Sequence, residues 1–98
     1  MAENCCAGKQ KHRTKEEQSA LINRLSRIEG QVRGIKGMIE REAYCTDIIT
    51  QVAAIRAALA SFQRQLLEAH INTCVTEDIQ RGELESRDEL LELLSKLL

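Results

Sequence analysis

The sequence contains no proline among its 98 residues, and none of its five glycines falls within one long central stretch. Between Cys45 and His70 neither residue type occurs, so this stretch is predicted to form one unbroken helix. No run alternates polar and apolar residues as a strand does, and no segment repeats. The sequence therefore predicts an all-α protein, whose short chain allows a single domain that gains stability from oligomerisation.

Long apolar runs are also absent. The chain starts with a polar segment, and no apolar run approaches the roughly 18 residues that a membrane-spanning helix needs. A signal peptide and a membrane span are therefore not expected, and the predicted location is cytoplasmic. There the four cysteines are expected to be reduced, which favours metal ligands or redox sensors over a disulfide framework. No hydrolytic triad or phosphate-binding loop is visible, so an enzyme is not expected.

The charge has no overall excess of one sign, since the net charge is -1. This excludes a generally basic protein, but the charges are distributed unevenly. Residues 1–36 hold eight Lys or Arg against four acids, whereas residues 77–98 hold seven acids against three bases. The asymmetry suggests one end that faces a polyanion, with solvated helix faces as the alternative interpretation.

Residues 1–13 are polar and basic without an apolar period, which predicts a disordered tail before a single domain at residues 14–98. A basic arm that could follow a phosphate backbone extends through Lys9, Lys11, Arg13 and Lys15. The adjacent Cys5 and Cys6 are expected to be incidental thiols. An auxiliary role in metal capture or redox chemistry is the alternative.

A capping box, Thr14-Lys-Glu-Glu17, predicts the start of a first helix. Apolar residues then recur at spacings of four and three, which is typical of a helical core stripe: Leu21, Leu25, Ile28, Val32, Ile35 and Ile39. Three arginines lie off this stripe, where they could reach phosphates: Arg24, Arg27 and Arg33.

A turn is expected near Glu42–Cys45, and a second helix follows with the same apolar spacing: Ile48, Val52, Ile55, Leu59, Phe62 and Leu66. Its middle is rich in alanine, so two backbones could approach closely there. Arg56 and Arg64 project from it as further candidate phosphate contacts. This helix should run to about Arg81, with Gly82 as its stop. A second capping box, Ser86-Arg-Asp-Glu89, predicts a short leucine-rich helix that needs a partner surface.

Cys45 and the pair His70–Cys74 have the residue types of a metal site. The pair has i, i+4 spacing, which places both side chains on one helix face, and thiolate with imidazole suits Cu(I) or Zn(II). A straight helix separates Cys45 from His70 by roughly 37 Å, so one chain cannot join all three. In an antiparallel dimer a second copy brings its own Cys45 alongside the pair, and two sites arise by symmetry. The two-fold axis then falls near residues 58–59, within the alanine-rich segment.

Three segments resemble a known family: Arg24-Leu-Ser-Arg-Ile-Glu-Gly-Gln-Val-Arg-Gly-Ile35, Tyr44-Cys45 and His70-Ile-Asn-Thr-Cys74. In this order they resemble the copper-sensitive operon repressor family (CsoR/RcnR-like), and the resemblance extends from Thr14 to the end. It implies a three-helix all-α protomer, an antiparallel dimer and a tetramer of two dimers. It also implies a repressor that binds operator DNA without a helix-turn-helix. Cu(I) would release such a repressor and so derepress copper-resistance and efflux genes.

The resemblance further implies that Cys45, His70 and Cys74 bind Cu(I), with Cys45 from the other chain. Tyr44 matches a residue that supports the site from outside the ligands, and Glu89 matches another when one residue is deleted in the preceding loop. The expected partners are operator DNA, further copies of the chain and a copper-chaperone donor. The candidate DNA contacts are Arg24, Arg27, Arg33, Arg56, Arg64 and Lys15.

Sister branches of this family supply the alternatives. Nickel and cobalt sensors use an extra N-terminal His, at whose position stands Arg13, with His12 one residue away. Persulfide sensors keep two cysteines but lack the His between them, so His70 argues against that branch. Formaldehyde-responsive members rely on the equivalent of Cys45 and usually lack the thiol of Cys74. A structural helical bundle with buried thiols is the alternative outside the family.

Overall fold

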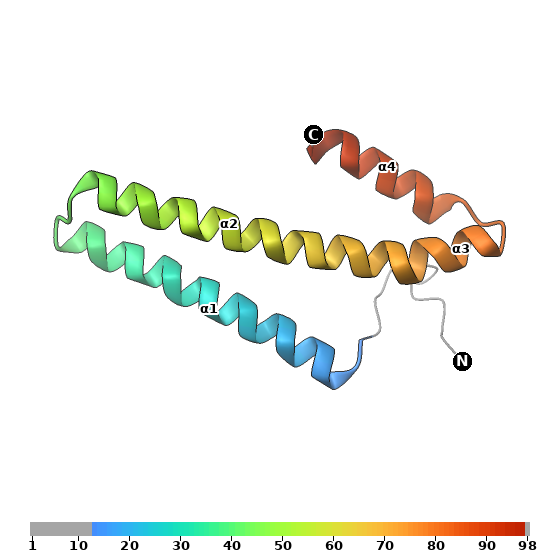
Figure 1. Ribbon diagram of the computed structural model, residues 1–98, viewed down its shortest axis with the longest axis horizontal. Helices are drawn as coiled ribbons and strands as arrows, with labels where there is room; N and C mark the ends of the chain where they lie inside the picture. The colour runs from blue at the N-terminus through green and yellow to red at the C-terminus, as the bar shows by residue number, and fades with distance from the viewer. Residues whose placement is uncertain (1–12, 98) are drawn as a thin grey trace. The chain divides into compact units, whose positions relative to one another are not determined.

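The computed structural model describes residues 13–97, which form helices joined by short turns (Figure 1). The elements are α1 (Lys15–Glu40), α2 (Cys45–His70), η1 (Ile71–Val75), α3 (Thr76–Gln80) and α4 (Glu85–Leu97). Because α2, η1 and α3 follow one another without a break, the described part has two long helices and a short C-terminal one, as predicted. The predictions for the tail and for Cys5 and Cys6 lie outside the described residues, apart from Arg13.

The first capping box forms as predicted. The backbone N–H of Glu17 donates to Thr14 Oγ1 at 3.1 Å, and the backbone N–H of Thr14 donates to Glu17 Oε1 at 2.9 Å. Two N–H groups that an α-helix leaves without an internal partner are thereby satisfied. These two bonds fix the start of α1 at Lys15.

Residues 13–65 form one compact unit, in which α1 and α2 lie side by side (Figure 1). The turn between them spans residues 41–44 and contains Glu42 with φ of 56°, so Cys45 is the first residue of α2. Only two residues of this unit are buried, Ile28 and Ile55. Many large apolar side chains remain exposed, including Ile22, Leu25, Val32, Ile39, Ile49, Val52 and Leu59. Exposed apolar surface on this scale indicates faces that other molecules cover.

Residues 66–98 belong to a second unit, described through Leu97, in which α4 contacts both η1 and α3. The helical run ends at Gly82, as predicted, because this residue adopts a φ of 81° that L side chains rarely adopt. The N–H of Gly82 donates to the carbonyl of Ile79 at 3.0 Å, and the N–H of Glu83 donates to the carbonyl of Asp78 at 2.8 Å. These two bonds make a Schellman motif, which turns the chain toward α4.

The second predicted capping box is wrong. The N–H of Asp88 donates to the carbonyl of Leu84 at 3.0 Å, so helical bonding begins before Ser86, which is the second residue of α4. Ser86 is buried, and its hydroxyl has no hydrogen-bond partner among the described residues. Ser86 therefore does not act as the helix cap that its spacing predicts.

The helical run Cys45–Gln80 is long and apolar enough, by length and composition, to cross a membrane. Its most apolar 18-residue window has a mean hydropathy of 1.2, and only 6% of that window is buried. This candidate was not predicted from the sequence, because no unbroken apolar run of sufficient length is present. The alanines between the polar residues nevertheless raise the mean hydropathy of the window. The core helix of a soluble protein passes the same test.

Candidate metal centre and nucleic-acid interface

Cys45 opens α2 with an exposed, free thiol. The residue before it, Tyr44, accepts the first backbone hydrogen bonds of the helix, from the N–H groups of Asp47 at 3.0 Å and Ile48 at 3.2 Å. The Tyr44 side chain takes no part in this capping and is 72% exposed. The thiol and the phenol are therefore both available to a neighbouring molecule.

His70 and Cys74 lie at the junction of α2 and η1. His70 is half-buried and closes α2, whereas Cys74 is a buried cysteine inside η1. The element η1 is a π-helical turn, in which the N–H of Thr76 reaches the carbonyl of Ile71 five residues earlier. The prediction of a regular α-helical turn between the two ligands is thus corrected. One extra residue per turn rotates Cys74 about the axis relative to its α-helical position.

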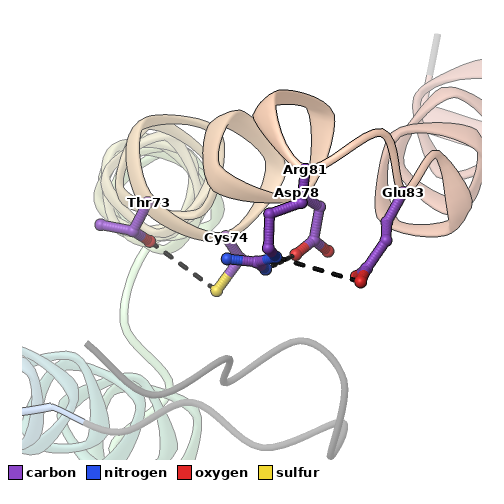
Figure 2. A network of polar contacts seen from close by, with 5 residues as sticks. All are labelled: Thr73, Cys74, Asp78, Arg81 and Glu83. Carbon is purple, nitrogen blue, oxygen red and sulfur yellow. Dashed lines mark hydrogen bonds and ion pairs between the residues drawn. The ribbon is translucent and has the colours of Figure 1, made fainter. Parts of the chain in front are cut away.

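Two threonine hydroxyls stabilise this π turn. Thr73 Oγ1 donates to the carbonyl of Ala69 at 2.7 Å, and Thr76 Oγ1 donates to the carbonyl of Ile71 at 2.5 Å. Thr73 Oγ1 also lies 3.8 Å from Cys74 Sγ (Figure 2). Hydroxyls that bond back to helix carbonyls offer the backbone an alternative to the regular ladder, which accounts for the irregular turn beside the thiol.

A single protomer does not bring the three predicted ligands together. Cys45 and His70 stand at opposite ends of the 26-residue helix α2, which separates them by roughly 37 Å. Among residues 13–97, no group of three or more His, Cys, Asp or Glu side chains is placed to hold a metal ion. The donor set itself fits Cu(I), because two cysteine thiols and an imidazole are soft to borderline ligands. A site made of all three would need Cys45 from another copy.

Glu89 lines the same hollow as His70. The other lining residues also belong to α4: Leu90, Glu92, Leu93 and Lys96. Lys96 Nζ lies 3.9 Å from Glu92 Oε1, so that pair is an exposed ion pair within α4. The structure therefore places Glu89 and His70 on the lining of one hollow, and the role of Glu89 stays a prediction. The sequence analysis missed Glu92 and Lys96, although both share the helical spacing of Glu89.

A polar network after Cys74 was also missed. Asp78 is buried and bonds to Arg81, which in turn reaches Glu83 (Figure 2). Helical spacing was the available signal, because Asp78 follows Cys74 by four residues and Arg81 follows Asp78 by three.

Two of the predicted DNA contacts lie together on the α1–α2 unit. Arg24 and Arg27 line a hollow with Gln31 and Ser61, above apolar groups that include Ile28. A hydrogen bond from Arg24 Nη1 to Gln65 Oε1 also orients the first guanidinium. An arginine held in this way loses less side-chain entropy when it meets a phosphate.

The remaining candidates do not share this hollow. Arg33 lies nine residues beyond Arg24, or about two and a half turns, which places it on the opposite side of α1. Three others are exposed at separate positions along the helices: Lys15, Arg56 and Arg64. One protomer therefore presents several basic positions, with a single pair at the hollow.

The helices and the ligand types together define a helical metal sensor. A family model described as metal-sensitive transcriptional repressor matches residues 17–96, so the chain belongs to the metal-sensitive transcriptional repressor family. The copper-sensing transcriptional repressor CsoR of Bacillus subtilis (strain 168) is 43% identical over 86 residues, which cover 87% of this chain and 85% of the relative. The copper-sensing transcriptional repressor RicR of Mycobacterium tuberculosis is 42% identical over 71 residues, or 72% and 74% of the two chains.

Solved structures similar to this chain include a copper-sensing and a nickel-responsive regulator. The copper-sensing repressor CsoR with Cu(I) from Geobacillus thermodenitrificans NG80-2 superposes with a TM-score of 0.86 at 45% identity, covering 90% of this chain and 93% of its own. The nickel-responsive transcriptional regulator InrS superposes with a TM-score of 0.71 at 38% identity, covering 91% and 98%. The family resemblance and the all-helical protomer predicted from the sequence are thereby confirmed.

Proposed function

We propose that this protein is a Cu(I)-responsive transcriptional repressor that binds operator DNA without copper and is released when Cu(I) binds, derepressing copper-resistance and efflux genes. The observation that carries the proposal is the donor set, two cysteine thiols and an imidazole, in a chain 43% identical to a copper-sensing repressor. The similar structure with Cu(I) supports the same metal. Such a protein acts by binding and not by catalysis, and it works in the cytoplasm.

Cys45 of one protomer and His70 and Cys74 of another would hold the metal. Bound there, Cu(I) would link thiolates and imidazole across the two chains. The antiparallel dimer that this requires crosses near residues 58–59, where α2 exposes small side chains. Leu59 is 45% exposed in the single protomer, and Ala57 and Ala60 are exposed as well. A face of this kind suits close contact between two helices.

Further apolar surface suits a tetramer of two such dimers. Leu91, Leu93 and Leu97 of α4 are each about half exposed, and the α1–α2 unit has only two buried residues. A small domain with so little core needs partner subunits for stability. Burial of these faces against other copies also accounts for the apolar composition of the Cys45–Gln80 run. A copper chaperone would serve as the metal donor.

Operator binding would use Arg24, Arg27, Arg33, Arg56, Arg64 and Lys15, with help from the basic tail. We expect Arg24→Ala and Arg64→Ala each to weaken operator binding and to lower the slope of log affinity against log salt by about one, because each loses about one phosphate contact. The measurement is fluorescence anisotropy with labelled operator at several salt concentrations.

Copper binding should persist in both variants, since neither arginine is a ligand. Arg87→Ala is the matched control, because Arg87 is an exposed cation on α4 that bonds to its neighbour Asp88. Unchanged operator affinity in both Arg24→Ala and Arg64→Ala would refute this interface.

The function itself is tested by anaerobic titration of the apo-protein on its operator with Cu(I), Ni(II) and Zn(II). We expect Cu(I) to release the operator at one equivalent per protomer, and the two divalent ions to leave it bound. Binding alone would not decide, because a Cys/His site binds ions that it does not sense. The similarity to InrS makes a nickel-responsive repressor the second candidate, and release by Ni(II) but not Cu(I) would establish it instead.

A further inference from the structure

The unit of residues 66–97 has a small buried core that includes Cys74, and two of the buried residues, Asp78 and Ser86, are polar. Its buried residues are Cys74, Val75, Asp78, Ser86 and Leu90. Asp78 follows Cys74 by four residues, so it lies on the same side of the helical run, and it is only 4% exposed. A carboxylate at this depth needs a partner of opposite charge.

Arg81 supplies that partner and also reaches the segment that leads into α4. Its Nη2 donates to Asp78 Oδ1, and its Nε lies 4.0 Å from Glu83 Oε1. Figure 2 shows the Arg81 guanidinium directed at both carboxylates, on the side of the helix toward which the Cys74 sulfur points. The backbone provides a second connection, since the N–H of Glu83 donates to the carbonyl of Asp78 at 2.8 Å.

We propose that Arg81 is a positioning residue of the metal response: by holding Asp78 and Glu83 together, it makes the start of α4 follow the turn that carries Cys74. This inference rests on the proposed function. Coupling between a metal site and a DNA site requires a contact that differs between the two states. In this proposal the Asp78–Arg81–Glu83 bridge is that contact: it would hold in one state and loosen in the other, so that a movement of the turn carrying Cys74 reaches the segment before α4.

The two ligands on this unit then have separate connections to α4. His70 shares its hollow with Glu89, whereas the helical run that carries Cys74 is joined to the segment before α4 by the Asp78–Arg81 and Arg81–Glu83 pairs. Ser86 does not serve as a cap for the start of α4, because its buried hydroxyl has no hydrogen-bond partner among the described residues. Removing Arg81 would leave the buried Asp78 carboxylate unpaired and favour its turning toward water, away from the Glu83 segment.

The test compares Arg81→Met with the wild type and with Arg87→Met as the matched control. Arg87 bonds to the adjacent Asp88 within α4, so its loss should leave the coupling intact. Operator affinity is measured with and without saturating Cu(I), and Cu(I) affinity is measured by competition with a chromogenic Cu(I) chelator, all under anaerobic conditions.

For Arg81→Met we expect copper-free operator affinity and Cu(I) affinity close to wild type, but a copper-dependent loss of operator affinity that is smaller by about threefold or more out of a total coupling of about 5–150-fold. Arg81→Lys keeps the positive charge and should therefore restore part of the copper-dependent release that Arg81→Met loses. If Arg81→Met does not fold, Glu83→Gln decides. Glu83→Gln preserves the Asp78–Arg81 pair and removes only the Arg81–Glu83 ion pair. This variant should also reduce the release of the operator by Cu(I).

Full copper-dependent release in Arg81→Met, or in Glu83→Gln if that variant is used, would overturn the proposal. An equal fall of Cu(I) affinity and copper-free operator affinity would also overturn it, since a general loss of structure would then explain the result. Failure of Cu(I) to release the wild-type protein is a different outcome, because it refutes the proposed function itself.

Discussion

Mixing Cys45→Ala protomers with His70→Ala/Cys74→Ala protomers is expected to restore a copper site that neither variant forms alone. Cys45 and His70 lie at opposite ends of α2, which spans roughly 37 Å, so no single protomer can close the site. A mixed dimer regains one complete set, made of Cys45 from one chain and the pair from the other. Each variant dimer by itself lacks a ligand in both of its sites.

The expected stoichiometry follows from the symmetry. Random exchange of equal amounts makes about half of the dimers mixed, each with one of two possible sites, so tight Cu(I) binding should recover to about a quarter of wild type. Anaerobic chelator competition measures the amount, and X-ray absorption measures the coordination number.

The control carries Cys5→Ala and Cys6→Ala in both variants, which removes the two other thiols of the chain. Three-coordinate binding that never returns in the mixture would refute the intersubunit site. Tight binding by unmixed Cys45→Ala protein would refute the role of Cys45.

The sequence predicted the helices well where local chemistry determines them. Thr14 and Glu17 can satisfy each other's backbone N–H groups, so the start of α1 follows from their spacing. Gly82 has the φ that a Schellman motif requires, so the end of the helical run follows from one residue. Both features depend on residues within one turn of each other.

The start of α4 was mispredicted because it depends on tertiary contacts. Ser86 and Glu89 have the spacing of a capping box, but α4 packs on η1 and α3 with Ser86 in the contact. Burial of that face, which includes Leu90, outweighs the local capping preference. The π turn at residues 71–75 was missed for a similar reason, since threonine hydroxyls bonding to carbonyls have no periodic signature.

The candidate site was predicted as a set of residue types and not as a geometry. The spacing of Cys45 from His70–Cys74 carries the argument for a second chain, because helix rise is nearly constant. Asp78, Arg81 and Glu83 were not found, since charged residues near a helix end are usually solvated. Only the burial of Asp78 distinguishes this group from an ordinary acidic helix end.

Glu89→Ala is expected to separate copper binding from copper response. The two thiolates that hold Cu(I) remain in this variant, so binding should persist. His70, when it holds the metal through one ring nitrogen, donates from the other, and an acceptor outside the ligand set normally fixes its orientation. Glu89 lines the same hollow as His70 and stands on α4, so it can receive that bond and connect His70 to α4. Without it, the copper-bound state loses the contact that distinguishes it from the free state.

The measurement is operator affinity of Glu89→Ala with and without saturating Cu(I). Allosteric coupling of this kind typically corresponds to a factor of about 5–150, and most of that factor should disappear. Tyr44→Phe should lose a smaller part, because Tyr44 stands beside Cys45 and keeps its backbone capping bonds. Glu92→Ala is the matched control: Glu92 lines the same hollow, but its carboxylate pairs with Lys96 within α4. If copper addition lowers the operator affinity of Glu89→Ala as much as that of the wild type, the connection from His70 through Glu89 to α4 is ruled out. The connection through Asp78, Arg81 and Glu83 would then remain.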